Sequence, residues 1–514
     1  MKMITKEIFP DIKYLSTKEI YQTIHRSKVI NRHQILSSLL EESFVRFYNR
    51  IALVDDEQIT YQKLDEFSND VADYIESNFS NEKYILVYAK RNWKTVAIIC
   101  GILKSGKAYV PISIDIPQKR LERIKLCTLS DVLLTEDMDF KNSLRRSTVK
   151  IVNEQDPAYV IFTSGSTGEP KGVEIPNISV ADTMQTASRL FGLNEYDVVL
   201  GISALTFDLS IFDLFSTLSV GGKLVIVKDN QNPALMHEKI KEEKVTTINT
   251  VAGAFSLLLD YSTRTGQLTD LTSLRTVVLS GDVVPARLVD NILENLPQTN
   301  LHIMGGPTEI TVWSNDYLYE TRNQKYSYVP YGLPIANKTM YVMKNHNAII
   351  EEEGEIVSGG IGLATGYIGD DELTSKKFWL HPDYGRLYNT GDLGIFTSDG
   401  LIKICGRVDN QVKINGFRVE LEEIERHIND IPEVVQSIVG VVTESNVAKL
   451  VAGVKISSSI NSNQIVSELE KNLPEYEIPS SFFELESIPL SANQKLDRKA
   501  FRRMMESSDS LKRL

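Results

Sequence analysis

The feature that most constrains the fold is an alternation of short, β-branched apolar runs with helix-like stretches. KYILVYA at 83–89 is followed by the helix-like NWKTVAIICGILKSG at 92–106 and then by KAYVPIS at 107–113. Further apolar runs occur at 223–229 and 274–282. Strands separated by helical segments are typical of parallel sheets with both faces covered. The pattern predicts a large α/β core.

The pattern of strand-like and helix-like runs changes near residue 408. Beyond it, LEEIERHI places Leu421, Ile424 and Ile428 at helical spacing, and strand-like and helix-like runs follow. A chain of 514 residues also exceeds what one core usually organises. We predict a linker-like leader over residues 1–35, a large α/β domain of mixed and parallel sheets covered by helices over residues 36–408, and a small, mobile α+β domain over residues 409–514.

Charge and composition exclude several classes of function. The net charge of -12 argues against nucleic acid as a partner, because phosphate backbones are bound by basic surfaces. The N-terminus MKMITKEIFPDIKY lacks the apolar core of a signal peptide, and no apolar window long enough to cross a membrane follows. Three widely separated cysteines suggest neither a disulfide framework nor a zinc site. We expect a cytoplasmic protein with no membrane partner.

A glycine-rich, hydroxyl-rich burst, TSGSTGEPKG, occupies residues 163–172. Lys171 stands where a Walker A lysine would, but Pro170 precedes it and Gly172 follows it, so the P-loop pattern fails. The remaining hydroxyls and backbone N–H groups can turn toward an anion. A polar surface loop between two strands would have the same composition, so the burst alone leaves both interpretations open.

The burst and six other blocks resemble, in order, the signatures of the adenylate-forming superfamily of acyl- and aryl-CoA ligases, luciferases and amino-acid adenylation domains. The burst is similar to the phosphate-binding signature of that superfamily. The other blocks are LKSGKAYVPIS at 103–113, GGPTE at 305–309, GEIVSGGIGLATGY at 354–367, YNTGDL at 388–393, GRVDNQVKINGFRVELEEIE at 406–425 and NQKLDR at 493–498. The resemblance covers nearly the whole chain.

Within the superfamily, the sequence most resembles the adenylation domains of nonribosomal peptide synthetases. In TFDLSIFD at 206–213, Asp208 matches the aspartate that pairs with a substrate α-ammonium. The resemblance implies that an amino-acid carboxylate attacks the α-phosphorus of ATP, giving aminoacyl-AMP and pyrophosphate. Transfer to the phosphopantetheine thiol of a carrier protein follows. The leader over residues 1–35 resembles the linker that precedes such domains.

The resemblance assigns roles around the nucleotide. Lys495 bridges the substrate carboxylate and ATP, Thr308 donates to the α-phosphate, and Glu309 binds Mg²⁺, a hard cation that prefers oxygen ligands. Asp392 accepts both ribose hydroxyls and Arg407 reaches the same region, although each alone would read as part of a surface ion pair. The implied ATP-binding set is Thr163, Ser164, Gly165, Ser166, Thr167, Gly168, Lys171, Ser280, Gly281, Asp282, Gly305, Gly306, Thr308, Asp392, Arg407 and Lys495.

Asp409 matches the hinge at which such enzymes rotate the small domain between half-reactions. The rotation replaces Lys495 with another face, including the loop from Lys413 to Gly416, and Lys413 is expected to act in the second half-reaction.

The specificity positions implied by the resemblance line a side-chain pocket without charge. Only Asn249 and Ser280 are polar there, so a charged substrate would lack a partner. Phe212 and Trp313 occupy volume, and the combination resembles cysteine-activating domains. We predict L-cysteine, followed by serine, alanine or threonine. The substrate-binding set is Asp208, Leu209, Phe212, Asn249, Val278, Ser280, Met304, Val312 and Trp313, with Lys495 on the carboxylate.

One position departs from the family pattern. Where many relatives carry an aromatic residue that stacks on adenine, this chain has Gly305, so adenine recognition is expected from backbone groups around Ser280 to Asp282 or from another aromatic residue. No carrier domain follows NQKLDR, so a separate carrier protein is expected as acceptor. Two alternatives stay open, a D-alanine–carrier protein ligase and a catalytically inactive nucleotide-binding homologue. Dependence on a small activator protein also stays open.

Overall fold

The computed structural model divides into two compact units, which are described separately. Unit 1 comprises Met1–Ser113, Thr128–Ile161 and Val173–Val408, and unit 2 comprises Ile114–Cys127, Phe162–Gly172 and Asp409–Leu514. The structure describes residues 16–26, 35–140, 152–164, 170–229, 231–281, 284–319, 329–398, 400–414, 416–444, 447–489, 496–507 and 513–514.

A nine-stranded sheet in unit 1 contains several of the predicted parallel strands. Its order is β14-β13-β12-β11-β10-β8-β9-β1-β2. Neighbours from β12 to β1 pair in parallel, and β13, β14 and β2 pair antiparallel at the two edges. The bounds are β1 (Ile51–Val54), β2 (Gln58–Thr60), β8 (Val198–Gly201), β9 (Lys223–Ile226), β10 (Thr247–Thr250), β11 (Thr276–Leu279), β12 (Asn300–Gly305), β13 (Asn315–Tyr319) and β14 (Leu333–Pro334).

Helices connect these strands, and local sequence sets where several of them begin. At the start of α10 the Asn232 side chain accepts from two backbone N–H groups, and Pro233 occupies the first turn, where its missing donor costs nothing. The helical bounds in this part of unit 1 are α7 (Asn177–Phe191), α8 (Leu209–Ile211), the π-helical η2 (Phe212–Ser216), α9 (Thr217–Ser219), α10 (Pro233–Glu243), α11 (Ala252–Arg264), η3 (Leu268–Ser273), α12 (Ala286–Asn295) and η4 (Thr308–Ile310).

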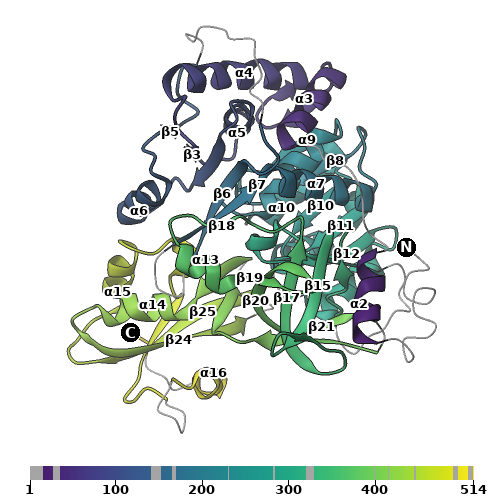
Figure 1. Cartoon of the computed structure of the whole chain (residues 1–514). Helices are drawn as coiled ribbons and strands as arrows, with labels where there is room; N and C mark the ends of the chain where they lie inside the picture. The colour runs from purple at the N-terminus through teal and green to yellow at the C-terminus, as the bar shows by residue number, and fades with distance from the viewer. Residues whose placement is uncertain are drawn as a thin grey trace. The chain divides into compact units, whose positions relative to one another are not determined.

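A six-stranded sheet of order β18-β7-β6-β4-β3-β5 includes the first predicted strands. Its helix α5 is apolar on nearly all sides and lies beside α4 (Figure 1). A Cβ at Gly101 would lie 2.6 Å from Cβ of Val71, so glycine permits this close approach. The bounds are α3 (Leu36–Arg46), α4 (Tyr61–Asn78), β3 (Tyr84–Tyr88), α5 (Trp93–Lys104), β4 (Ala108–Ile112), β5 (Leu133–Leu134), β6 (Pro157–Thr163), β7 (Lys171–Pro176) and β18 (Gly366–Tyr367).

A third sheet is antiparallel, with order β16-β15-β17-β20-β19 and β21 paired to β20. The helix α2 packs against β15 (Figure 1), and the buried Tyr21 hydroxyl accepts from Val342 N and donates to Ile349 O, both at 3.0 Å. The bounds are α2 (Thr17–Arg26), β15 (Lys338–Lys344), β16 (Asn347–Ala348), β17 (Glu353–Gly360), α13 (Asp371–Lys377), β19 (Phe378–His381), β20 (Gly385–Phe396) and β21 (Ile402–Arg407).

Unit 2 has its own apolar core. Leu421, Ile424 and Ile428 are all buried on α14, as their spacing predicted, and they pack with strand residues such as Val439. The strands form a β22-β23 hairpin and a three-stranded β24-β25-β26 sheet. The bounds are α6 (Gln118–Thr128), β22 (Gln411–Ile414), β23 (Phe417–Glu420), α14 (Leu421–Asn429), β24 (Val434–Glu444), β25 (Val447–Ile456), α15 (Ser462–Leu469), η5 (Glu475–Glu477), β26 (Ser481–Glu484) and α16 (Arg498–Ser507).

The predicted fold class, α/β with mixed sheets and a smaller C-terminal α+β part, is confirmed. Among the residues that the structure describes, no helix combines the length and apolarity needed to cross a membrane.

Candidate active site

Asp208 lies just before the short helix α8, which continues into the π-helical turn η2. Single π-helical turns occur frequently at functional sites. The Asp208 side chain is almost fully buried, at 4% exposure, and its carboxylate accepts a hydrogen bond of 2.7 Å from the Thr308 hydroxyl. The contact joins the predicted ammonium ligand to the predicted α-phosphate donor, across 100 residues of sequence.

Glu309 lies in η4, one residue beyond Thr308, and is fully buried. Its carboxylate accepts a hydrogen bond of 2.7 Å from the Tyr367 hydroxyl, and its carbonyl accepts one of 2.8 Å from Ala364 N. Ala364 and Tyr367 belong to the block GEIVSGGIGLATGY. Two of the sequence blocks therefore meet at the predicted magnesium ligand.

Asp392 and Arg407 lie opposite each other on the antiparallel strands β20 and β21. The Arg407 guanidinium donates to the Asp392 carboxylate and also to Thr390 O, the latter at 3.2 Å. The two side chains are only 17% and 20% exposed. The pairing brings together two predicted nucleotide-binding residues that come from two separate blocks.

The eight predicted specificity positions all lie in the interior of unit 1. Asn249 and Val278 are register neighbours on β10 and β11, Met304 lies on β12, and Val312 and Trp313 follow η4. None is more than 3% exposed. The eight are Leu209, Phe212, Asn249, Val278, Ser280, Met304, Val312 and Trp313. The structure therefore places them on neighbouring elements.

The two polar members of this set bond to the protein itself. The Asn249 amide donates to Leu209 O and to the Asp213 carboxylate, both at 3.2 Å, and its oxygen accepts from the Ser280 hydroxyl at 3.2 Å. Burial raises the pKa of Asp213 to about 6, opposed by hydrogen bonds from Ser203 and Asn249. The Asn249 amide, which the sequence predicts as a polar group of the pocket, therefore already has its hydrogen-bond partners within the protein.

Three aromatic rings fill space around the specificity positions. The Phe212 and Trp313 centroids are 5.2 Å apart, and Phe191 lies 5.5 Å from Phe212 and 6.0 Å from Trp313. Phe191, at the end of α7, was not among the predicted residues. The cluster supports the expectation that little volume is left for a side chain.

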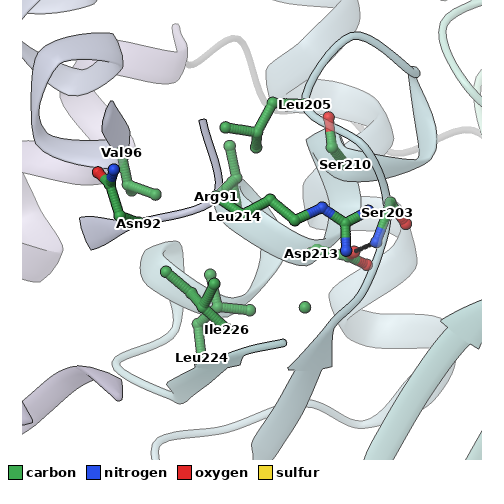
Figure 2. A pocket seen from close by; sticks show the side chains of 11 residues that line it. Arg91, Asn92, Val96, Ser203, Leu205, Ser210, Asp213, Leu214, Leu224 and Ile226 are labelled. Carbon is green, nitrogen blue, oxygen red and sulfur yellow. Dashed lines mark hydrogen bonds between the residues drawn. The ribbon is translucent and has the colours of Figure 1, made fainter. Parts of the chain in front are cut away.

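A small cavity of about 20 Å³ adjoins this region and is too small for a substrate (Figure 2). Figure 2 shows the Arg91 guanidinium beside the Asp213 carboxylate, and Arg91 also donates to Ile202 O and Val227 O. Burial lowers the pKa of Arg91 to about 10, while the Asp213 charge raises it. Arg91 therefore remains a cation at neutral pH and compensates the buried carboxylate.

Gly305 has no room for a side chain because the Tyr331 ring occupies that space. A Cβ at Gly305 would lie 2.4 Å from Cε2 of Tyr331. Burial and the nearby charge of Asp392 both raise the pKa of Tyr331. An aromatic ring therefore lies against the GGPTE backbone and within the electrostatic influence of the carboxylate predicted to hold the ribose.

Thr163, Ser164, Lys171 and Lys413 of the predicted set belong to unit 2, and Gly281 and Gly306 belong to unit 1. Ser164 is buried and its hydroxyl donates to Arg418 O. The Lys171 side chain is 9% exposed, and its ammonium lies 3.6 Å from the Glu420 carboxylate. Lys413 pairs with Arg418 in the β22-β23 hairpin, and Thr163 ends β6.

The structure does not describe several of the predicted site residues. Gly165, Ser166, Thr167, Gly168, Asp282 and Lys495 lie outside the described residues. Gly281 is described and adopts a left-handed φ of 79°. Asp409 is the first residue of the last segment of unit 2, and its role as a hinge stays a prediction.

Comparison with known proteins identifies the family. A family model described as AMP-binding enzyme matches residues 40–144 and 124–368. Bacitracin synthase 1 of Bacillus licheniformis is 35% identical over 459 residues, which are 88% of this chain and 9% of that protein. Zwittermicin A synthase ZmaJ of Bacillus cereus is 32% identical over 492 residues, covering 90% of this chain and 94% of that protein.

Solved structures agree with the sequence comparison. NpsA-ThdA from Klebsiella oxytoca, an artificially fused adenylation–PCP di-domain, has a TM-score of 0.80 and 23% identity, and the match covers 88% of this chain and 94% of that chain. The chain spans less than half the length of several curated relatives that it matches. The family predicted from the ordered sequence blocks is confirmed, and the chain belongs to the AMP-binding enzymes with the fold of a nonribosomal peptide synthetase adenylation domain.

Proposed function

We propose that this chain activates a small amino acid with ATP and transfers it to the phosphopantetheine thiol of a carrier protein. In the first step a carboxylate oxygen attacks the α-phosphorus, the bond to the bridging oxygen breaks, and pyrophosphate leaves. In the second step the thiolate attacks the acyl carbonyl and AMP leaves. The observation that carries the proposal is the buried Asp208 carboxylate, held by the Thr308 hydroxyl at 2.7 Å. Each oxygen of a carboxylate accepts more than one hydrogen bond, so Asp208 can also bind an α-ammonium group, which supplies both a donor and a counter-charge.

The described residues suit this chemistry through charge rather than covalent catalysis. Glu309, oriented by Tyr367, would offer a hard oxygen ligand to Mg²⁺. Bound Mg²⁺ would neutralise charge on the departing pyrophosphate. The Asp392 carboxylate, oriented by Arg407, has acceptor oxygens for ribose hydroxyls. Lys495 is proposed to bridge the carboxylate and ATP, and Lys413 to serve the transfer step.

L-cysteine is the proposed substrate, with serine, alanine or threonine as the next candidates. Phe191, Phe212 and Trp313 occupy volume, which favours a small side chain. The Asn249 amide is already bonded within the protein, so the residues at the specificity positions offer few hydrogen-bonding groups to a substrate hydroxyl. A thiol is a weak donor and a small apolar group, and it loses less than a hydroxyl in such surroundings.

A carrier protein is the proposed acceptor of the activated amino acid. The di-domain NpsA-ThdA joins an adenylation domain to a PCP domain, which supports such a partner. Incubation of the protein with Mg·ATP and L-cysteine should yield cysteinyl-AMP, detected by mass spectrometry. D-alanyl-AMP formed in preference from a mixture would instead support the D-alanine–carrier protein ligase, and an aryl-adenylate would overturn amino-acid activation.

Tyr331 is predicted to supply the aromatic surface for adenine that Gly305 lacks. Base stacking on aromatic side chains contributes about 1–3 kcal/mol. Tyr331→Leu should therefore raise the KM for ATP by about tenfold or more and leave the KM for the amino acid nearly unchanged. Both are measured by ATP–pyrophosphate exchange.

Tyr319→Leu is the control for this substitution. Tyr331 is partly buried, and Tyr319 is a buried tyrosine of the same unit that lies among residues outside the predicted site. An unchanged KM for ATP in Tyr331→Leu, or an equal rise of both KM values, would remove Tyr331 from the nucleotide site.

A further inference from the structure

Lys338 is a buried lysine whose three donors all bond to one loop. It begins β15, is only 2% exposed, and its ammonium donates to Ile310 O at 2.6 Å, Thr311 O at 2.9 Å and Trp313 O at 2.6 Å. An ammonium group has three donors and no acceptor, so these bonds use its full capacity. A single cation thus gathers three main-chain carbonyls.

The loop that Lys338 holds has an uncommon backbone. Thr311 has a φ of 59° and Val312 a φ of 65°, in the left-handed region that β-branched residues rarely adopt. Such a conformation persists only where the surroundings enforce it. The other contacts of the loop include a bond of 2.8 Å from the Thr311 hydroxyl to Gly362 O. The lysine is the only described charged group that bonds to these carbonyls.

The residues around Lys338 leave space for its side chain and carry compensating charge. A Cβ at Gly362 would lie 2.3 Å from Cε of Lys338, so the absence of a side chain at this glycine provides the space that the lysine occupies. Burial lowers the pKa of Lys338, while the charges of Asp182 and Asp208 raise it. Asp208 is the proposed ligand of the substrate ammonium, so Lys338 also helps to balance that buried carboxylate.

We propose that Lys338 is a positioning residue that sets the shape of the amino-acid pocket through the carbonyls of Ile310, Thr311 and Trp313. This inference rests on the proposed function, because it names the residue that holds the loop Ile310–Trp313, which carries the predicted specificity residues Val312 and Trp313. Lys338 does not touch the substrate. Its removal should change which amino acids are accepted while ATP binding stays as it is.

The test is Lys338→Met, which keeps the length and apolar stem and removes the charge and donors. In ATP–pyrophosphate exchange we expect the KM for the best amino acid to rise by about tenfold or more, with the KM for ATP within about twofold. The amino-acid profile should broaden, because the wall is no longer held in one conformation.

Lys104→Met is the matched control. Lys104 is likewise buried, with its side chain 7% exposed, and its ammonium donates to Asn69 Oδ1 at 2.8 Å and to the Asp65 carboxylate, outside the proposed site. It should lower the melting temperature without changing either amino-acid KM or profile. Equal changes in both KM values for Lys338→Met, or the same kinetic change in Lys104→Met, would overturn the positioning role.

If Lys338→Met does not fold, Lys338→Gln is the second variant. Its amide keeps two donors for the loop, which favours folding, and it removes the charge and one donor. The amino-acid KM should then rise with the KM for ATP unchanged, and a Lys338→Gln enzyme with wild-type amino-acid KM and profile would overturn the inference. Wild-type protein without amino-acid-dependent exchange would refute the proposed function itself. An active wild type with an unaltered Lys338→Met profile refutes only the role of Lys338.

Discussion

Asp208→Asn should abolish most of the preference for an α-amino acid over the same acid without its amino group. Asparagine keeps an oxygen that can accept from Thr308, so the fold around the site is retained. The substrate ammonium would then be buried without its counter-charge, which costs about 3 kcal/mol or more. We expect kcat/KM for the amino acid to fall by about a hundredfold or more. Exchange assays with L-cysteine and with 3-mercaptopropionate measure the effect.

The decisive readout is the ratio between these two substrates. For wild type the amino acid should be strongly preferred, and for Asp208→Asn the ratio should collapse, since only the amino acid loses a partner. Asp197→Asn is the matched control, because Asp197 is also buried but bonds to Arg275 and Thr246. An unchanged ratio in Asp208→Asn would contradict the assignment of Asp208.

Glu309→Gln should reduce kcat for adenylation by about a hundredfold or more, since single electrostatic groups at charged transition states have effects of this size. Glutamine preserves the shape and can still accept from the Tyr367 hydroxyl, so the loss would report the charge that binds Mg²⁺. Exchange rates measured over a range of Mg²⁺ concentrations should show a higher requirement for the metal.

Tyr367→Phe separates the charge of Glu309 from its orientation. It keeps the carboxylate and removes the hydroxyl that donates to Glu309 at 2.7 Å and also lies 3.4 Å from the Tyr388 hydroxyl. The expected loss is about tenfold, the size of one hydrogen bond to a charged group. Activity of Glu309→Gln within about threefold of wild type would exclude Glu309 as the magnesium ligand.

The sequence predicted those parts of the fold and site that depend on local pattern. Apolar runs separated by helix-like stretches predicted the parallel strands β3, β4 and β9, since such runs must be covered on both faces. The block GGPTE predicted Glu309 and the element TFDLSIFD predicted Asp208, and the structure places both in the interior of unit 1.

Contacts that arise only in the folded chain could not be predicted. Lys338 lies in KTMYVMK, where a lysine at a strand end reads as exposed, and its burial follows from the approach of Ile310–Trp313 and from the space at Gly362. Tyr331 is 26 residues beyond Gly305, so its ring could be expected there only from the three-dimensional structure.

The leader shows the same limit. Residues 1–35 read as polar without a strong period, yet α2 buries Ile20, Tyr21 and Ile24 on one face. These three residues are spaced as on one face of a helix, but the helix is only ten residues long, which is too short for the pattern to stand out in the sequence. The antiparallel sheet from β15 to β21 was not evident either, because its strands lack the intervening helices that mark parallel units.

The most direct test of the account is ATP–pyrophosphate exchange across all twenty L-amino acids, D-alanine and a set of aryl acids. The account predicts exchange that depends on a small, uncharged L-amino acid, with L-cysteine highest and charged or aromatic amino acids near background. Strongest exchange with a charged or aromatic amino acid would contradict the pocket. No exchange with any amino acid, in protein that binds ATP, would contradict amino-acid activation and support the inactive homologue.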